Sequence, residues 1–208
     1  MPDPLPDLPP LYILRHGQTR WNVEGRMQGR KDSALTDLGR AQAAAQRDLL
    51  APILAQHADI ACFSSPLGRA ATTAQIALAG RKVRLDPRIA EVSVGPWEGR
   101  LRAEVLAEGL PALAGARVRP SASESAMFDL FLSAPEGEGF EATKARCKDF
   151  LAALQQPAVI VSHGVISAVL RGLACGLSRA GMARLAHHQG CVVEIIAGRE
   201  RLIQGSVT

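Results

Sequence analysis

Two histidines and two arginines stand where short apolar runs of the sequence end. Arg15 and His16 come directly after the first such run, and His163 follows a later one. Arg69 lies about one helical turn beyond the end of a third run. If these runs are neighbouring parallel strands, their carboxyl ends share one rim of a sheet, where such sheets bind ligands. The spacing therefore predicts a pocket that holds two imidazoles and two guanidinium groups.

Such a cluster is suited to a tetrahedral oxyanion, and phosphate is the natural candidate. The guanidinium group is a rigid, permanently charged fork of N–H donors, and each charge-assisted contact contributes about 1.5–3 kcal/mol. A phosphoryl group can therefore be held here without a metal. The sequence has no GxxxxGK[ST] run and no GxGxxG after the first apolar run, which argues against a P-loop and a dinucleotide site.

The two histidines allow two interpretations. A neutral core histidine that hydrogen-bonds to the backbone is common for one isolated residue. That account is weaker for two histidines that both end a strand and both precede a glycine, Gly17 and Gly164. The functional interpretation is a nucleophile or a proton carrier, because neighbouring positive charge favours the neutral ring with a free lone pair.

The elements that must position these groups alternate between strand and helix. Buried strands are predicted at 11–14, 60–63 and 158–161, a more amphipathic one at 82–85, and a closing pair at 191–197 and 200–204. Helices are predicted from the N-cap Thr36 onwards, at 67–78, at 140–154 and at 165–174. Pro52 is expected to kink or end the first helix, and 15–33 is expected to be a polar loop. This alternation predicts an α/β fold with a mostly parallel central sheet covered on both faces.

Composition limits the classes of protein that fit. The 208 residues are 47% hydrophobic and 21% charged, which suits one globular domain rather than a disordered chain. No uncharged apolar stretch approaches the roughly 18–20 residues that a membrane-spanning helix requires. The net charge of +4 comes from scattered arginines and not from a basic stripe, so nucleic-acid binding has no support.

Residues 1–10 are rich in proline and are expected to form a disordered tail. This segment has neither the basic nor the apolar region of a signal peptide. The four cysteines show no CxxC spacing and three of them lie in apolar runs, which fits free thiols in a reducing compartment. We therefore expect a cytoplasmic protein with a single domain over 11–208.

Five blocks of sequence stand in order along the chain. They are RHGQTRWN (15–22), QG with DSALT and a later glycine (28–39), SPLGRA with a following TA (65–74), EVSVGPWEG (91–99) and SHG (162–164). Together these blocks resemble the histidine phosphatase superfamily, in its phosphoglycerate-mutase-like branch. The resemblance implies a three-layer αβα sandwich of the phosphoglycerate-mutase type.

The resemblance also implies a mechanism without cofactor or metal. His16 would attack phosphorus and carry the phosphoryl group as a phosphohistidine, and Glu91 would protonate the leaving oxygen and then help to activate water. By its position alone, Glu91 reads as a surface carboxylate before a turn. The implied binding residues are Arg15, Arg69 and His163, helped by Asn22, at the phosphoryl oxygens, and Gln28 and Gly29 at the substrate.

The leading function is metal-independent hydrolysis of a small phosphorylated metabolite, a phosphomonoester. The alternative within the family is a phosphoglycerate mutase. The mutases that the sequence resembles are longer, however, and carry a tyrosine shortly after the acid, near the place of Val94 here. A catalytically dead binding module would lack at least one of the central residues, and all are present. The sequence leaves the natural substrate and the oligomeric state open.

Residues 98–134 mix short helical pieces with glycine and proline, and we expect this segment to be an insertion that covers the substrate. Its arginines could recognise a substrate anion, but solvated charge is the simpler interpretation for Arg100, Arg102, Arg117 and Arg119. The adjacent His187 and His188 are expected on the surface or in a loop, because neighbouring histidines seldom point the same way.

Overall fold

The computed structural model describes residues 8–57, 59–108 and 124–205. Its strands are β1 (Leu11–Arg15), β2 (Ala61–Ser64), β3 (Val83–Leu85), β4 (Ala158–Ser162), β5 (Val192–Ile196) and β6 (Arg199–Ile203). Its helices are α1 (Arg20–Glu24), α2 (Asp37–Gln56), α3 (Gly68–Ala77), α4 (Arg102–Ala107), α5 (Glu124–Leu132), α6 (Gly139–Ala152), α7 (Gly164–Ala174) and α8 (Arg179–Met182). Two 3₁₀ turns, η1 (Pro87–Ile89) and η2 (Gly95–Trp97), lie between β3 and α4. The strands and the longer helices match those expected from the sequence to within a few residues.

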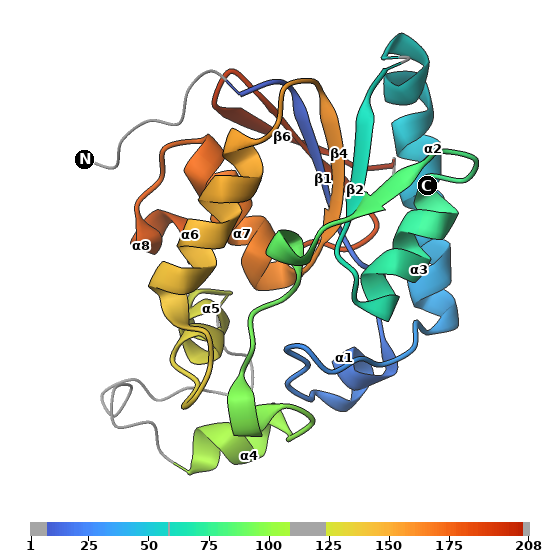
Figure 1. Cartoon of the computed structure of the whole chain (residues 1–208). Coiled ribbons are helices and arrows are strands. Elements are labelled where there is room, and N and C mark those ends of the chain that lie inside the picture. Colours follow the sequence, from blue (N-terminus) through green and yellow to red (C-terminus); the bar gives the residue numbers. More distant parts are fainter. Residues whose placement is uncertain (1–7, 58, 109–123, 206–208) are drawn as a thin grey trace.

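The six strands form one sheet in the order β3-β2-β4-β1-β5-β6. The strands from β1 to β4 run parallel to their neighbours among themselves, whereas β5 pairs antiparallel with β1 and β6 pairs antiparallel with β5. Helices α2 and α3 cover one face of the sheet, and α6 and α7 cover the other (Figure 1). The expected three-layer sandwich with a mostly parallel central sheet is confirmed, and the ends of β1, β2 and β4 do share one rim.

Strand β1 lies near the middle of the sheet and is buried on both faces. Leu11 and Ile13 belong to the apolar cluster that α6 and α7 complete. Tyr12 and Leu14 belong to the cluster that α2 and α3 complete. Since successive strand residues point to opposite faces, a strand covered on both sides must be apolar at its buried positions, as residues 11–14 of β1 are.

A short helix, α1, interrupts the segment expected to be a polar loop. Thr19 caps it, because its hydroxyl oxygen accepts from the backbone N–H of Asn22 at 3.1 Å. The side-chain oxygen of Asn22 accepts in return from the backbone N–H of Thr19 at 3.0 Å. This capping box turns the chain back after β1 and holds Asn22 close to the strand end.

Pro52 does not end α2, which continues to Gln56. A proline inside a helix leaves the carbonyl oxygen four residues earlier without its usual donor. Asp48 and Pro52 are both exposed, so water can hydrate that carbonyl oxygen. Of the two outcomes expected at Pro52, a kink or an end of the helix, the end is therefore wrong.

Two segments of special interest are described in part. Of the expected tail over 1–10, residues 1–7 lie outside the described residues, whereas Leu8 packs against the core and the Pro10 carbonyl oxygen accepts from the Ala158 N–H at 3.0 Å. Of 98–134, the part over 109–123, with Arg117 and Arg119, lies outside as well. Within the described ranges no helix is both long enough and apolar enough to cross a membrane.

Two glycines allow the end of β1 to contact the start of α2. A Cβ on Gly39 would lie 2.1 Å from the carbonyl oxygen of Gln18, and one on Gly17 would lie 2.1 Å from that of Gly39. We expect Gly39→Ala to lower the free energy of unfolding by about 1–3 kcal/mol, because the backbone must move to admit the methyl group. Urea unfolding measures this. Gly205→Ala is the control, since its Cβ would meet nothing within 4 Å, and equal effects of the two variants would contradict the prediction.

Candidate active site

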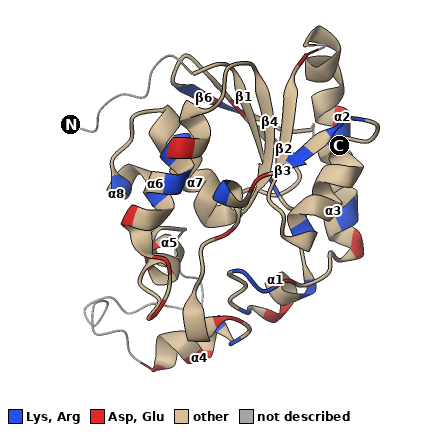
Figure 2. Cartoon of the chain, in the orientation of Figure 1, with Lys and Arg blue, Asp and Glu red and all other residues tan. Residues whose placement is uncertain are grey.

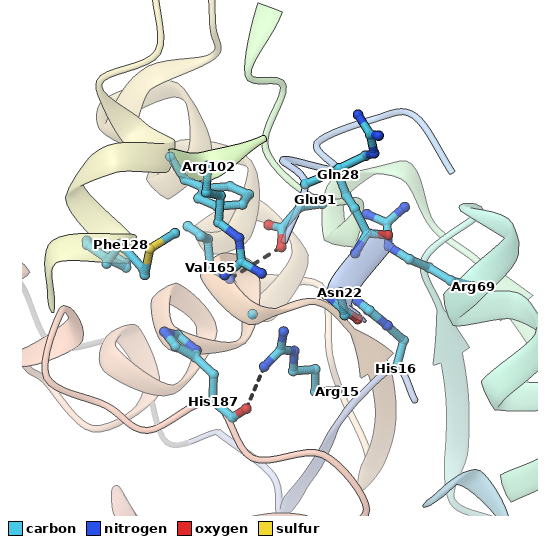
Figure 3. A pocket seen from close by; sticks show the side chains of 14 residues that line it. Arg15, His16, Asn22, Gln28, Arg69, Glu91, Arg102, Phe128, Val165 and His187 are labelled. Carbon is cyan, nitrogen blue, oxygen red and sulfur yellow. Dashed lines mark hydrogen bonds between the residues drawn. The ribbon is translucent and has the colours of Figure 1, made fainter. Parts of the chain in front are cut away.

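A cavity of about 490 Å³ opens at the carboxyl ends of β1 and β4 (Figure 3). Its wall combines charged side chains that follow the strands with apolar side chains of α5. It is lined by Arg15, His16, Asn22, Arg26, Gln28, Arg69, Glu91, Arg102, Met127, Phe128, Phe131, Gly164, Val165 and His187. Six of the eight site residues expected from the sequence are in this wall, whereas His163 and Gly29 are not.

His16 lies at the end of β1 with 3% of its surface exposed. Its ring Nδ1 is 2.8 Å from the carbonyl oxygen of Gly17. A carbonyl oxygen only accepts hydrogen bonds, so the ring proton sits on Nδ1 and Nε2 keeps its lone pair. Burial, and then the charges of Arg69 and Arg15, lower the pKa of His16 well below its usual value. The ring is therefore a neutral base, and its free nitrogen is available to react.

Arg69 is held rigidly at the start of α3, with 2% of its surface exposed. One terminal nitrogen donates to the Lys31 carbonyl oxygen at 2.9 Å and to the Asp32 carboxylate at 3.0 Å. The other donates to the Gly29 carbonyl oxygen at 2.8 Å. Its Nε is buried and has no partner among the described atoms. Gly29 thus supports Arg69 instead of lining the cavity.

Arg15 connects the first strand to the loop that precedes β5. Its terminal nitrogen donates to the carbonyl oxygen of His187 at 2.6 Å (Figure 3). The side chain of Gln46 donates to the carbonyl oxygen of Arg15 at 3.0 Å. Helix α2 and the loop therefore fix the backbone and the guanidinium group of this residue.

The imidazole ring of His163 packs against that of His16. Its ring centroid is 5.2 Å from that of His16, and its Nε2 is 2.7 Å from the hydroxyl oxygen of Ser65. The side chain is fully buried. Burial, and then the charge of Arg69, lower the pKa of His163 well below its usual value. Like His16, it is a neutral imidazole at neutral pH.

Glu91 is a buried carboxyl of the cavity wall, with 5% of its surface exposed. One oxygen accepts from the Val92 N–H at 3.1 Å and the other from the Val165 N–H at 3.4 Å (Figure 3). Burial raises the pKa of Glu91, against the lowering effect of the Arg69 charge. The surface carboxylate suggested by its position alone is therefore excluded, and the protonated form persists to higher pH than in an ordinary glutamic acid.

Asn22 and Gln28 complete the polar part of the wall. The side-chain oxygen of Asn22 is occupied by the Thr19 backbone N–H and hydroxyl, at 3.0 and 3.1 Å. Gln28 has 5% of its surface exposed, and its side-chain oxygen is buried without a partner in the described part of the chain. Both amides lie where they can contact a bound group.

His187 is a wall residue that sequence reasoning missed. It lies in the loop before β5, as expected, but it is turned into the cavity (Figure 3). Burial, and then the charges of Arg15 and Arg171, lower its pKa to about 3. The sequence carries no local signal for this placement, which depends on the pairing of β5 with β1.

Arg102 and the aromatic residues of α5 were missed as well. Arg102 is half-buried in the wall, so solvated charge was the wrong interpretation for it. Arg100 fits that interpretation better, because it is paired with the exposed Glu108. Phe128 and Phe131 stand three residues apart in α5 and bring an apolar face to the cavity, a spacing that could have indicated such a face.

An ion pair between the buried Arg171 and the more exposed Glu200 supports the loop that carries His187. Arg171 of α7 makes two hydrogen bonds to the carboxylate of Glu200, at 2.7 and 2.6 Å, and a third to the Ala186 carbonyl oxygen at 2.7 Å. In the same loop the side chain of Gln189 donates to the His16 carbonyl oxygen at 2.9 Å. The loop is thereby fixed to the residue that follows β1, His16.

A metal site receives no support from the described residues. Among them no group of three or more His, Cys, Asp or Glu side chains is placed to hold a metal ion. Basic and acidic positions are interspersed along the described elements (Figure 2).

Comparison with known proteins shows which family and which structures this chain is similar to. The family model of the histidine phosphatase superfamily (branch 1) matches residues 11–204. Glucosyl-3-phosphoglycerate phosphatase of Mycolicibacterium vanbaalenii is 36% identical over 80% of this chain and 74% of its own. The crystal structure of alpha-ribazole phosphatase from Shigella flexneri is similar with a TM-score of 0.71 and 28% identity, over 94% of this chain and 96% of that chain. Phosphoglycerate mutase of Thermus thermophilus is similar with a TM-score of 0.66 and 31% identity, over 89% of this chain and 92% of that chain.

Proposed function

The chain belongs to branch 1 of the histidine phosphatase superfamily and is a phosphatase, and from this premise we propose that it hydrolyses a small phosphomonoester through a phosphohistidine at Nε2 of His16. The observation that carries the proposal is the bond between the Nδ1 of His16 and the Gly17 carbonyl oxygen. It fixes the tautomer in which Nε2 has a lone pair, and the low pKa of the ring keeps that lone pair unprotonated.

In the first step, Nε2 of His16 attacks phosphorus and a P–N bond forms as the P–O bond to the leaving alcohol breaks. Glu91 gives its proton to the leaving oxygen, so the alcohol departs neutral. Arg15 and Arg69 hold the phosphoryl oxygens and balance their charge, with His163 and Asn22 beside them. Phosphoryl transfer depends mainly on such positioning and charge stabilisation.

In the second step, water attacks the phosphohistidine and the P–N bond breaks. The carboxylate of Glu91, now without its proton, accepts a proton from that water. Phosphate leaves, and His16 and Glu91 return to their starting protonation states. The raised pKa of Glu91 supports both roles, because it keeps the proton available for donation at higher pH and makes the carboxylate a stronger base once the proton has left.

We also propose that residues 98–134 cover the bound substrate. Arg102 at one end of the segment and Phe128 and Phe131 at the other line the cavity, which supports this role.

All four cysteines are free, which supports a reducing compartment such as the cytoplasm.

The test of the function is turnover of 4-nitrophenyl phosphate in the presence of a chelator. We expect phosphate release at the same rate with and without the chelator, and loss of activity on chelation would contradict the proposal. A mutase is the second candidate, because the Thermus thermophilus mutase has a similar structure. With 2- and 3-phosphoglycerate, interconversion faster than phosphate release would favour the mutase.

A further inference from the structure

The cavity wall contains a cation, Arg102, whose charge is not balanced by any carboxylate of the described residues. Arg26 is paired with Glu24 at 2.6 Å, and Arg69 is paired with Asp32 at 3.0 Å. For Arg102, no ion pair is found within the described part of the chain, although its guanidinium group lines the same cavity (Figure 3). Arg102 is therefore a cation of this wall that has no counter-charge among the described residues.

The side chain of Arg102 is nevertheless fixed in its position. Both its backbone N–H and its side-chain Nε donate to the carbonyl oxygen of Gly25, at 2.9 and 3.2 Å. Gly25 ends α1 in the left-handed conformation, with φ of 70°, and so directs that carbonyl oxygen. Neither terminal nitrogen of Arg102 donates to a residue of the described ranges, which leaves the fork of the guanidinium group for a ligand.

Burial without a counter-charge is unfavourable for an arginine. Desolvation lowers the pKa of Arg102, and no charged group of the described residues opposes this effect. The group remains charged at neutral pH, because the guanidinium pKa starts far above it. An anion bound at the two terminal nitrogens would remove the penalty and form charge-assisted, bidentate hydrogen bonds.

Apolar side chains share the cavity with this cation. Met127, Phe128 and Phe131 project from α5, and Val165 lies beside Glu91. Such a surface gains free energy only when it is covered by an apolar group. A small, fully hydrated alcohol such as glycerate would leave it in contact with water.

We propose that the substrate of this enzyme is a phosphomonoester whose leaving alcohol has an apolar body and a carboxylate, and that Arg102 binds the carboxylate while α5 covers the apolar body. The proposal rests on the function proposed above. A carboxylate is favoured over a second phosphate because one unbalanced cation matches one negative charge. The aromatic residues of α5 favour a flat or branched apolar body.

The test compares pairs of esters that differ only in this charge. We use 3- and 4-carboxyphenyl phosphate against the matching carbamoylphenyl phosphates, in which a neutral carbamoyl group of similar shape replaces the carboxylate. For at least one position we expect kcat/KM of the carboxylate to exceed that of the amide about tenfold, which corresponds to about 1.4 kcal/mol. In Arg102→Met we expect the ratio to fall to about one.

Arg100→Gln is the matched control, because Arg100 lies two residues away and pairs with the exposed Glu108. Its ratio should stay at the wild-type value. If Arg102→Met is recovered unfolded, Arg102→Gln is measured in the same way. A wild-type ratio of one or less at both positions overturns the proposal, and so does a ratio that the Arg102 variants leave unchanged.

A binding measurement separates this proposal from the function on which it rests. If no ester is hydrolysed, the proposed function fails, and calorimetry with the non-hydrolysable carboxyphenyl and carbamoylphenyl phosphonates decides about Arg102. Preferential binding of the carboxylate that is lost in Arg102→Met supports the anion site. Equal binding of the two phosphonates overturns it.

Discussion

Replacing His16 by alanine is expected to abolish hydrolysis of 4-nitrophenyl phosphate. The imidazole is the only group that the proposed mechanism joins covalently to phosphorus, and the remaining arginines bind the ester without attacking it. Removal of a covalent nucleophile reduces kcat on the order of 10⁴–10⁶-fold. Initial rates of nitrophenol release measure this, with His57→Ala as the control because His57 lies at the far end of α2.

A trapping experiment tests the same residue independently of the steady-state rate. Rapid quenching of the wild-type enzyme in base, with a ³²P-labelled ester as substrate, should retain label on His16, since phosphohistidine withstands base and is hydrolysed in acid. The His16→Ala protein should carry none. Activity of His16→Ala within tenfold of the wild type, or label on another residue, would show that the mechanism is wrong.

Glu91→Gln is expected to reduce kcat/KM more strongly for esters with a more basic leaving group. For an alkyl phosphate the loss should be about 10²–10⁴-fold, the usual contribution of a general acid. For 4-nitrophenyl phosphate it should be about tenfold or less, because nitrophenolate is stable as an anion. We compare kcat/KM and not kcat, since the second step needs Glu91 with every substrate. Equal losses for the two esters would remove Glu91 from the role of acid.

The pH dependence gives a second test of Glu91. Burial raises the pKa of this carboxyl, so the proton needed by the leaving alcohol is present at low pH and is lost as pH rises through the raised pKa. For the alkyl ester, kcat/KM of the wild type should therefore fall on the alkaline side, and the amide of Glu91→Gln should abolish that fall. His16 cannot produce the same fall, because a nucleophilic imidazole becomes more reactive as it loses its proton, and its lowered pKa places that change at lower pH.

The sheet and the half of the cavity that carries the proposed phosphoryl-binding residues could be predicted because their signals are local. Residues 11–14 of β1 and 158–161 of β4 are apolar without interruption, as a strand buried on both faces requires. The reactive residues follow these strands directly, so placing the strands also placed Arg15, His16 and His163. The family blocks added Glu91, whose own surroundings in the sequence suggest nothing more than a turn.

The distal half of the cavity could not be predicted because it is made by contacts between distant segments. Arg102 is positioned by the carbonyl oxygen of Gly25. His187 is brought to Arg15 by the pairing of β5 with β1. The predicted end of α2 at Pro52 was wrong for a different reason. Pro52 is tolerated inside the helix because the carbonyl oxygen that it leaves without a donor can be hydrated.

The place of β1 in the sheet has a consequence for how the enzyme is made. Its two neighbours, β4 and β5, both come from the last quarter of the sequence, so a nascent chain on the ribosome carries β1 for most of translation with neither edge paired. Such long-range pairing forms slowly and leaves the strand exposed to aggregation meanwhile. A chain released before residue 187 has been synthesised would lack both β5, which pairs with β1, and the His187 carbonyl oxygen that accepts from Arg15, and we expect it to be inactive.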